Sequence, residues 1–175
     1  MGSLNIIIEK SKILEEVITF IPSVNKDERG TIFTTFNKGI YSKYLPQNIE
    51  FIHDKFAESK KNVLRGLHGD NKTWKLITCI YGEIFEVVVD MRPDSSTFLK
   101  WDSYELNSKN KKQILVPPNF VNGYCVLSEF AVFHYKLAYT GEYFDVAQQM
   151  VVKWNDERLK IKWPCVNPIL QERDK

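Results

Sequence analysis

Short apolar runs with a period of two fill the middle of the chain and constrain its fold more than any other feature. In the run AVFHYKL, Phe133 and Tyr135 share one face, while His134 and Lys136 share the other. Such runs, rich in β-branched and aromatic residues, predict strands. The expected strands are Glu16–Pro22, Gly30–Asn37, Ile49–Lys55, Asn62–Leu67, Lys75–Tyr81, Glu83–Met91, Lys100–Leu106, Lys112–Val116, Val121–Val126, Ala131–Leu137 and Gln148–Trp154.

Clusters of turn-forming residues separate these strands at short intervals, as at Lys26–Gly30 and Arg92–Ser96. Helical turns are expected only at Gly39–Tyr44 and Asp156–Leu159. Many short strands at this spacing predict a mostly β protein, a jelly roll or closed antiparallel barrel with a natural ligand cavity inside. Because 175 residues fit one domain, residues 1–175 are expected to form a single unit.

Composition excludes several classes of protein. With 43% hydrophobic and 26% charged residues, the chain is expected to be globular, and its net charge of +2 provides no broad basic surface for nucleic acid. No run reaches transmembrane length and no signal peptide is seen, which predicts a cytoplasmic protein without a membrane partner. Cys79, Cys125 and Cys165 lie in apolar runs and are odd in number. Reduced thiols are therefore expected rather than disulfides.

The segment VLRGLHGD holds the first candidate for chemistry, because His68 follows Arg65 across Gly66. A histidine here is as consistent with packing as with catalysis. Arg65 and His68 have opposite parity along a strand, but a bulge at Gly66 could turn both towards one cavity. Lys75 begins a row that is otherwise apolar; a lysine at a strand end more often reaches solvent.

The order and spacing of several segments resemble the dTDP-4-dehydrorhamnose 3,5-epimerase family. These segments are KKNVLRGLH, WKLITCIYGEIFEVVVDMRPDSSTF, KNKKQILVPPNFVNGYCVLSE, FHYK and VKWNDERLKIKWP, and the likeness extends from Asp27 to Pro164. The resemblance implies a cupin-type jelly roll that is usually a homodimer, needs no metal or other cofactor, and acts on nucleotide-linked 4-keto sugars. His53, His68 and His134 are also too scattered to suggest a metal site.

A proton next to a ketone can be removed only if the enolate oxygen is stabilised. The site therefore needs a base, an acid on the opposite ring face, and a cation or donor near the carbonyl oxygen. The resemblance implies His68 as the base and Asp156 as the carboxylate that orients it. It implies Tyr135 as the acid and Lys75 as the enolate stabiliser. Taken alone, Asp156 would be interpreted as a helix cap and Tyr135 as a core aromatic.

Further residues are expected to bind the substrate. Arg29 and Arg65 match residues that hold the diphosphate in the family, where a guanidinium can bind bidentately. His53 and Tyr143 are also expected at the site. Asn122 stands where the family generally has a second histidine. Because an amide offers only a neutral donor, the exchange of the C3 proton is expected to be faster than that at C5.

Departures from the family pattern bear on the substrate. Thr31–Thr34 replaces aromatic and acidic residues that help to hold thymine, His53 replaces a glutamine, and Tyr139–Phe144 is rewritten. These changes favour a GDP-linked 4-keto-6-deoxy hexose or heptose used in capsule or O-antigen synthesis. The leading hypothesis is a metal-independent isomerase, an epimerase that inverts C3, or C3 and C5. The alternatives are dTDP-4-dehydrorhamnose 3,5-epimerase proper, a keto-isomerase, and a non-catalytic sugar-binding cupin.

Overall fold

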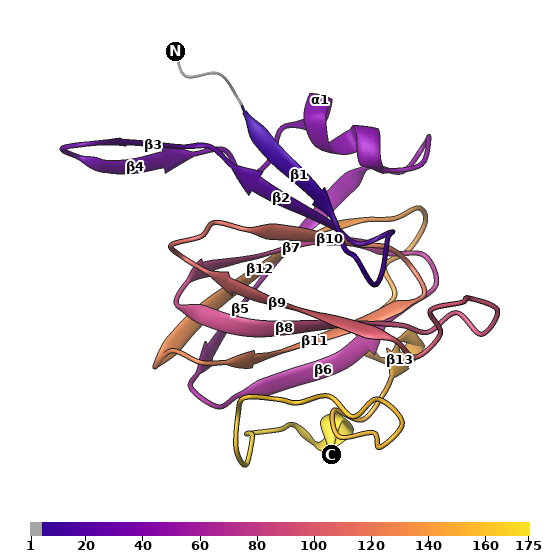
Figure 1. Cartoon of the computed structure of the whole chain (residues 1–175). Helices are drawn as coiled ribbons and strands as arrows, with labels where there is room; N and C mark the ends of the chain where they lie inside the picture. The colour runs from indigo at the N-terminus through magenta and orange to yellow at the C-terminus, as the bar shows by residue number, and fades with distance from the viewer. Residues whose placement is uncertain (1–4) are drawn as a thin grey trace.

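The computed structural model of the protein describes residues 5–175, which form two facing antiparallel sheets and a projecting hairpin (Figure 1). The six-stranded sheet has the order β1-β2-β10-β7-β12-β5, the five-stranded sheet has the order β13-β6-β11-β8-β9, and β3 and β4 form the hairpin. The strands are β1 (Ile6–Lys10), β2 (Ile18–Pro22), β3 (Val24–Asp27), β4 (Gly30–Phe33), β5 (Phe51–Lys60), β6 (Leu64–Gly69), β7 (Trp74–Tyr81), β8 (Glu83–Asp90), β9 (Trp101–Asn107), β10 (Gln113–Val116), β11 (Phe120–Val126), β12 (Phe130–Ala138) and β13 (Met150–Val151). The predicted mostly β jelly roll is confirmed.

Helical structure is confined to short turns. Helix α1 (Lys38–Tyr41) and the 3₁₀ turn Ser42–Tyr44 confirm the helical turns expected there, and further 3₁₀ turns lie at Val146–Gln148 and Glu172–Asp174. The turn expected to be helical at Asp156–Leu159 is not helical. Among residues 5–175, no helix is long and apolar enough to span a membrane.

Helix α1 covers part of the outer face of the six-stranded sheet. The ring of Tyr41 packs on Phe20 of β2 with 4.8 Å between ring centroids, and its hydroxyl donates to Gln113 Oε1 of β10 at 2.6 Å. These contacts let a buried tyrosine satisfy its hydroxyl while it seals the sheet.

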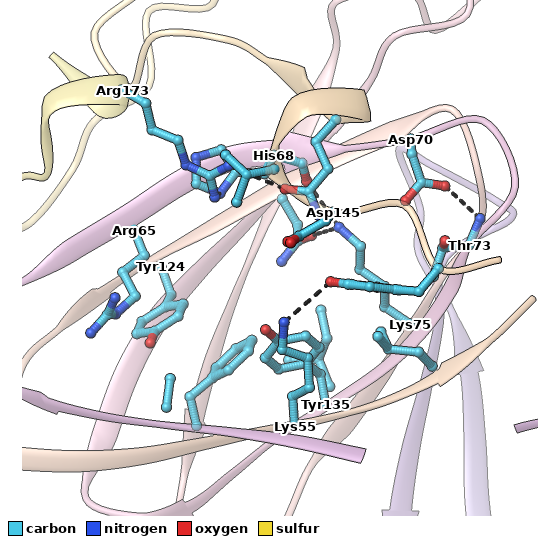
Figure 2. A pocket seen from close by; sticks show the side chains of 18 of the residues that line it. Lys55, Arg65, His68, Asp70, Thr73, Lys75, Tyr124, Tyr135, Asp145 and Arg173 are labelled. Carbon is cyan, nitrogen blue, oxygen red and sulfur yellow. Dashed lines mark hydrogen bonds between the residues drawn. The ribbon is translucent and has the colours of Figure 1, made fainter. Parts of the chain in front are cut away.

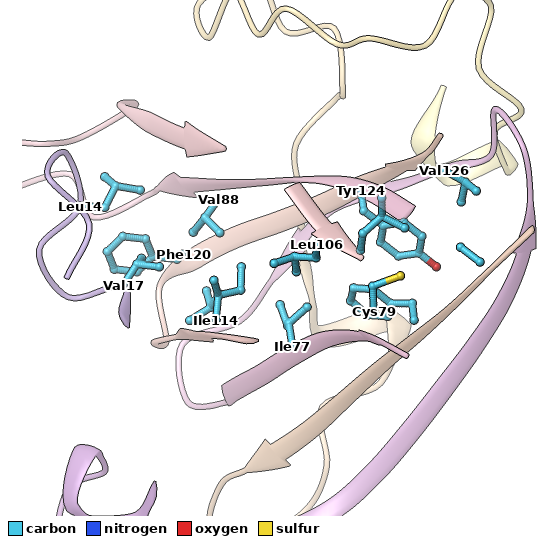
Figure 3. Close-up of a cluster of buried hydrophobic side chains, with 14 residues drawn as sticks. Leu14, Val17, Ile77, Cys79, Val88, Leu106, Ile114, Phe120, Tyr124 and Val126 are labelled. Carbon is cyan, nitrogen blue, oxygen red and sulfur yellow. The ribbon is translucent and has the colours of Figure 1, made fainter. Parts of the chain in front are cut away.

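The main hydrophobic core lies between the two sheets (Figure 3). Side chains from β7 to β12 fill it, joined by Leu14 and Val17 from the N-terminal segment. Ile77, Tyr124 and Phe133 belong both to this core and to the lining of a cavity. The cavity therefore rests directly on the core, so packing fixes its walls.

A bulge at Gly66 brings Arg65 and His68 into the same cavity. The pairing of β6 with β11 shifts register between Asn122 and Tyr124, and Gly66 has a φ of 122°. A Cβ at Gly66 would lie 2.5 Å from Gly123 Cα, so only glycine fits at this crossing. Arg65 and His68 both line the cavity, which confirms the bulge predicted at Gly66.

The cysteines differ from expectation. Cys125 of β11 is joined to Cys165 in a disulfide, with 6.5 Å between their Cα atoms, whereas Cys79 is free and buried. The prediction of three reduced thiols is therefore wrong for this pair. Apolar neighbours indicated burial, but a partner 40 residues away is visible only once the C-terminal segment packs on β11.

Candidate active site

A cavity of about 200 Å³ lies between the two sheets, below the loop that follows β12 and the C-terminal segment (Figure 2). Strands β5, β7 and β12 supply one wall, and β6 and β11 supply the other. Six of the residues singled out in the sequence line it together: Arg65, His68, Lys75, Asn122, Tyr135 and Tyr143.

His68 is held at both ring nitrogens by the C-terminal segment. Its Nε2 lies 2.6 Å from Oδ1 of Asp174, which is fully buried, and its Nδ1 lies 2.9 Å from a guanidinium nitrogen of Arg173. Because arginine can only donate, Nδ1 must accept, and Nε2 must carry the proton that it donates to Asp174. The structure therefore fixes the tautomer, with the basic lone pair on Nδ1 beside the cavity.

Asp156 does not meet His68, so that prediction needs correction. Its carboxylate accepts from the backbone nitrogen and the side chain of Arg158, at 3.0 Å and 2.7 Å. The hydrogen bonds from Arg158 also lower the pKa of Asp156. Asp156 organises a local turn, which is close to the capping interpretation that its sequence alone suggested. The carboxylate at His68 is Asp174.

Lys75, Asn122 and Glu86 are linked by hydrogen bonds that run from the cavity wall to the buried Glu86. Lys75 Nζ donates to Asn122 Oδ1 at 2.7 Å and to the His68 carbonyl oxygen at 3.0 Å. Asn122 Nδ2 donates to Oε1 of Glu86 at 2.7 Å. Because an ammonium can only donate, the amide oxygen must face Lys75 and the amide nitrogen must face Glu86. Glu86 thereby sets the orientation of Asn122.

Burial shifts the pKa values of Lys75 and Glu86, the two charged groups that Asn122 links. It lowers the pKa of Lys75 to about 8, against the attraction of Asp70 and Glu86. It raises the pKa of Glu86 to about 8, against the hydrogen bond from Asn122 and the charge of Lys75. At neutral pH the favoured protonation states are therefore a positively charged Lys75 and a neutral Glu86. This state leaves a net positive charge where an enolate oxygen could be stabilised.

Tyr135 enters the cavity from the sheet opposite His68. Tyr135 lies on β12 of the six-stranded sheet, while His68 lies on β6 of the five-stranded sheet. Burial raises the pKa of Tyr135, and the charge of Lys55 partly offsets this effect. The phenol therefore stays protonated at neutral pH and can act as an acid. A base and an acid on opposite walls can serve the two faces of one sugar ring.

Some of the residues expected to bind substrate line the cavity, and others do not. Arg65 lines the cavity and donates from Nε to Ser59 Oγ at 3.1 Å. His53 lies beside Tyr143, with 4.9 Å between ring centroids, but does not itself line the cavity. Arg29 lies on the β3–β4 hairpin, where its exposed guanidinium pairs with Asp27. Arg29 is thus not part of the cavity of its own chain.

Sequence reasoning missed Asp174, Arg173, Glu86 and Lys55. Asp174 and Arg173 sit in the charged tail QERDK, which gives no sign of burial. Glu86 offered a usable signal, because it is a lone carboxylate in the apolar run IFEVVV. Within residues 5–175, no three His, Cys, Asp or Glu side chains cluster as a metal site.

The fold and the cavity define a class of protein: a jelly roll whose cavity holds a histidine–carboxylate pair, a tyrosine and a buried lysine, the groups needed for acid–base chemistry beside a ketone. The sequence model of the family described as dTDP-4-dehydrorhamnose 3,5-epimerase matches residues 11–175. The chain belongs to this family and is an isomerase.

Relatives and solved structures agree with this assignment. The chain is 38% identical to a dTDP-4-dehydrorhamnose 3,5-epimerase of Shigella flexneri over 92% of this chain and 89% of the relative. It is 26% identical to a dTDP-4-dehydrorhamnose 3-epimerase of Streptomyces niveus, over 92% and 78%. The structure of dTDP-6-deoxy-D-glucose-3,5-epimerase of Legionella pneumophila, in complex with dTDP-4-keto-L-rhamnose, matches with a TM-score of 0.89, 32% identity and coverage of 97% and 90%.

Proposed function

We propose that the protein inverts C3 and then C5 of a dTDP-linked 4-keto-6-deoxyhexose by proton transfer through an enolate. The observation that carries the proposal is the placement of His68, paired with Asp174, on the wall opposite Tyr135. A two-face arrangement is what inversion needs, whereas a keto-isomerase does not have to serve both faces of the ring. A non-catalytic sugar-binding protein would need none of these proton-transfer groups.

The chemistry follows from the arrangement of the donors. Nδ1 of His68 exchanges its contact with Arg173 for the substrate and takes the proton next to the ketone. Asp174 then stabilises the imidazolium. The charge that moves to the ketone oxygen meets Lys75, whose half-buried ammonium group lines the cavity. Tyr135 returns a proton to the same carbon from the other face. Asn122 keeps the ammonium of Lys75 in place.

The nucleotide is proposed to be dTDP. The preference for GDP that the departures at Thr31–Thr34 favoured is not supported, because the relatives from Shigella and Legionella are named for dTDP sugars. The Legionella structure, which matches 97% of this chain, holds a dTDP sugar. The experiment is a thermal unfolding series with dTDP and GDP at equal concentrations. A larger rise in Tm with dTDP supports the proposal, and a larger rise with GDP contradicts it.

A homodimer is proposed to complete the site. Arg29, expected to hold the diphosphate, is carried by a hairpin that projects away from the body of its own chain (Figure 1). In a dimer this hairpin would reach the cavity of the second copy. The test mixes Arg29→Ala, in which diphosphate binding is weakened, with His68→Asn, which lacks the base. In a mixed dimer one site regains both groups, so activity should return on mixing. A lack of recovery, or a monomer by light scattering, would contradict the proposal.

The cellular location of the enzyme is proposed from the chemistry of its substrate. A diphosphate sugar is a charged metabolite that does not cross a membrane unaided, so the enzyme is placed in the cytoplasm. Cell fractionation tests this placement, and the state of Cys125 in cell extracts tests whether its disulfide persists there.

Capsule or O-antigen synthesis is the proposed pathway. Unchanged surface polysaccharide after deletion of the gene would remove that assignment.

A further inference from the structure

Lys55 of β5 lies next to Tyr135 of β12, the strand with which β5 pairs. The two residues are register partners in the β5–β12 pair, and both line the cavity. The Nζ of Lys55 lies 5.9 Å from the centroid of the Tyr135 ring. It also donates to the hydroxyl of Tyr143 at 3.3 Å. No step of the proposed mechanism so far uses this second lysine.

The placement of Lys55 is not that of a surface lysine. On β5 the outer face carries the charged residues Asp54, Glu58 and Lys60, whose side chains are exposed. Lys55 instead lies on the inner face beside Ala57, and both line the cavity. The inward position of Lys55 therefore has a cost in desolvation, which suggests a role inside the cavity.

The surroundings of Lys55 keep its ammonium group charged. Burial alone lowers the pKa of Lys55, but Tyr135, Tyr143 and Asp145 more than offset this, so the net shift is upward. The second cation near Tyr135 is Arg65, which is tied to Ser59. Lys55 is thus a cation held close to the phenol that must give up a proton.

We propose that Lys55 is a positioning residue that stabilises the phenolate of Tyr135 during the second proton transfer. The inference rests on the proposed function. In this step the O–H bond of Tyr135 breaks and a C–H bond forms with the electron pair of the enolate. The carbonyl re-forms, and the negative charge passes from the enolate oxygen to the phenolate. A buried phenolate without a cation nearby is costly, so Lys55 lowers the barrier to this step alone.

The experiment separates the two proton transfers. In deuterium oxide, His68 can remove a proton and return a deuteron to the same face, which gives exchange without inversion. Inversion also needs Tyr135. For Lys55→Met, which keeps the length of the side chain, we expect inversion to fall about tenfold more than exchange, equivalent to about 1.4 kcal/mol. Lys55→Arg should restore most of the inversion, because it restores the charge.

Several controls decide between outcomes. Lys60→Met, on the outer face of the same strand, should change neither rate. The rise in Tm with dTDP should be the same in wild type and Lys55→Met, and Lys55→Gln provides a second neutral variant if the methionine variant does not fold. Equal losses of exchange and inversion, or no loss, would overturn the proposal for Lys55. An absence of exchange in the wild type would instead overturn the proposed function.

Discussion

The imidazole of His68 shares a 2.6 Å hydrogen bond with Asp174, which lies 106 residues further along the chain. The C-terminal segment reaches this position by pairing with the start of β6, where Leu64 N donates to the Ile169 carbonyl at 3.1 Å. The last residues of the chain are therefore part of the candidate active site.

Asp174→Asn is expected to reduce turnover by about 10²-fold or more. The amide keeps the size of the side chain but cannot stabilise the imidazolium, and it favours the wrong tautomer of His68. Asp156→Asn is the matched control and should stay within about twofold of wild type, since Asp156 only organises a surface turn. Steady-state kinetics on both variants checks the assignment. Equal losses would return Asp156 to the mechanism.

Asn122→His is expected to speed proton exchange at C5 relative to C3. In the wild type, Asn122 is a neutral amide fixed between Lys75 and Glu86, so it adds no charge as the ring shifts for the second inversion. An imidazolium there could follow the ketone oxygen. The ratio of the two exchange rates, measured by NMR in wild type and variant, provides the test. A wild-type C5 that already exchanges as fast as C3 would show that the amide suffices.

Glu86→Gln is expected to change how stability depends on pH. Burial raises the pKa of Glu86 from 4.5 to about 8. The native state therefore binds one proton more than the unfolded state between these values, and the stabilisation present below pH 4.5 is lost as the pH rises to about 8. Relative to the glutamine variant, the free energy of unfolding of the wild type should fall by up to about 1.4 kcal/mol per pH unit.

Urea unfolding at pH 5, 6, 7 and 8 checks this expectation, with Glu58→Gln on the exposed face of β5 as the control. Lys75 contributes with the opposite sign, but only above about pH 8, because burial lowers its pKa to about 8. A difference between wild type and Glu86→Gln that stays constant from pH 5 to pH 8 would mean that Glu86 is already ionised in this range.

The sequence predicted local features well. Alternation placed Tyr135 inside and His134 and Lys136 outside, because side chains on a strand must alternate between its faces. For Lys75 the strand position favoured solvent, and only the family resemblance put it in the cavity that it lines. The bulge at Gly66 also followed from local reasoning. Strands β1 and β3 were missed: β3 has the polar sequence VNKD and is exposed, so it carries no apolar alternation. Its pairing with β4 defines it instead.

Long-range pairings could not be predicted in this way. Asp156 was assigned because it stood in the motif WND, which resembles the family. Asp174 was not considered, because it stood in a charged tail whose burial depends on how the chain returns to β6. The Cys125–Cys165 disulfide was missed for the same reason, since its partners meet only after that return. The position of Lys55 beside Tyr135 could be found only once β5 was known to pair with β12.

The most direct test of the account is proton exchange by wild type and His68→Asn. Each protein is incubated with a dTDP-linked 4-keto-6-deoxyhexose in deuterium oxide, the product is reduced chemically, and the C3 and C5 proton signals are followed by NMR. We expect loss of both signals with the wild type, C3 first. With His68→Asn we expect no loss and an unchanged rise in Tm with dTDP, since the base acts in the transition state. Exchange by His68→Asn within about tenfold of wild type, a difference below about 1.4 kcal/mol, would contradict the account.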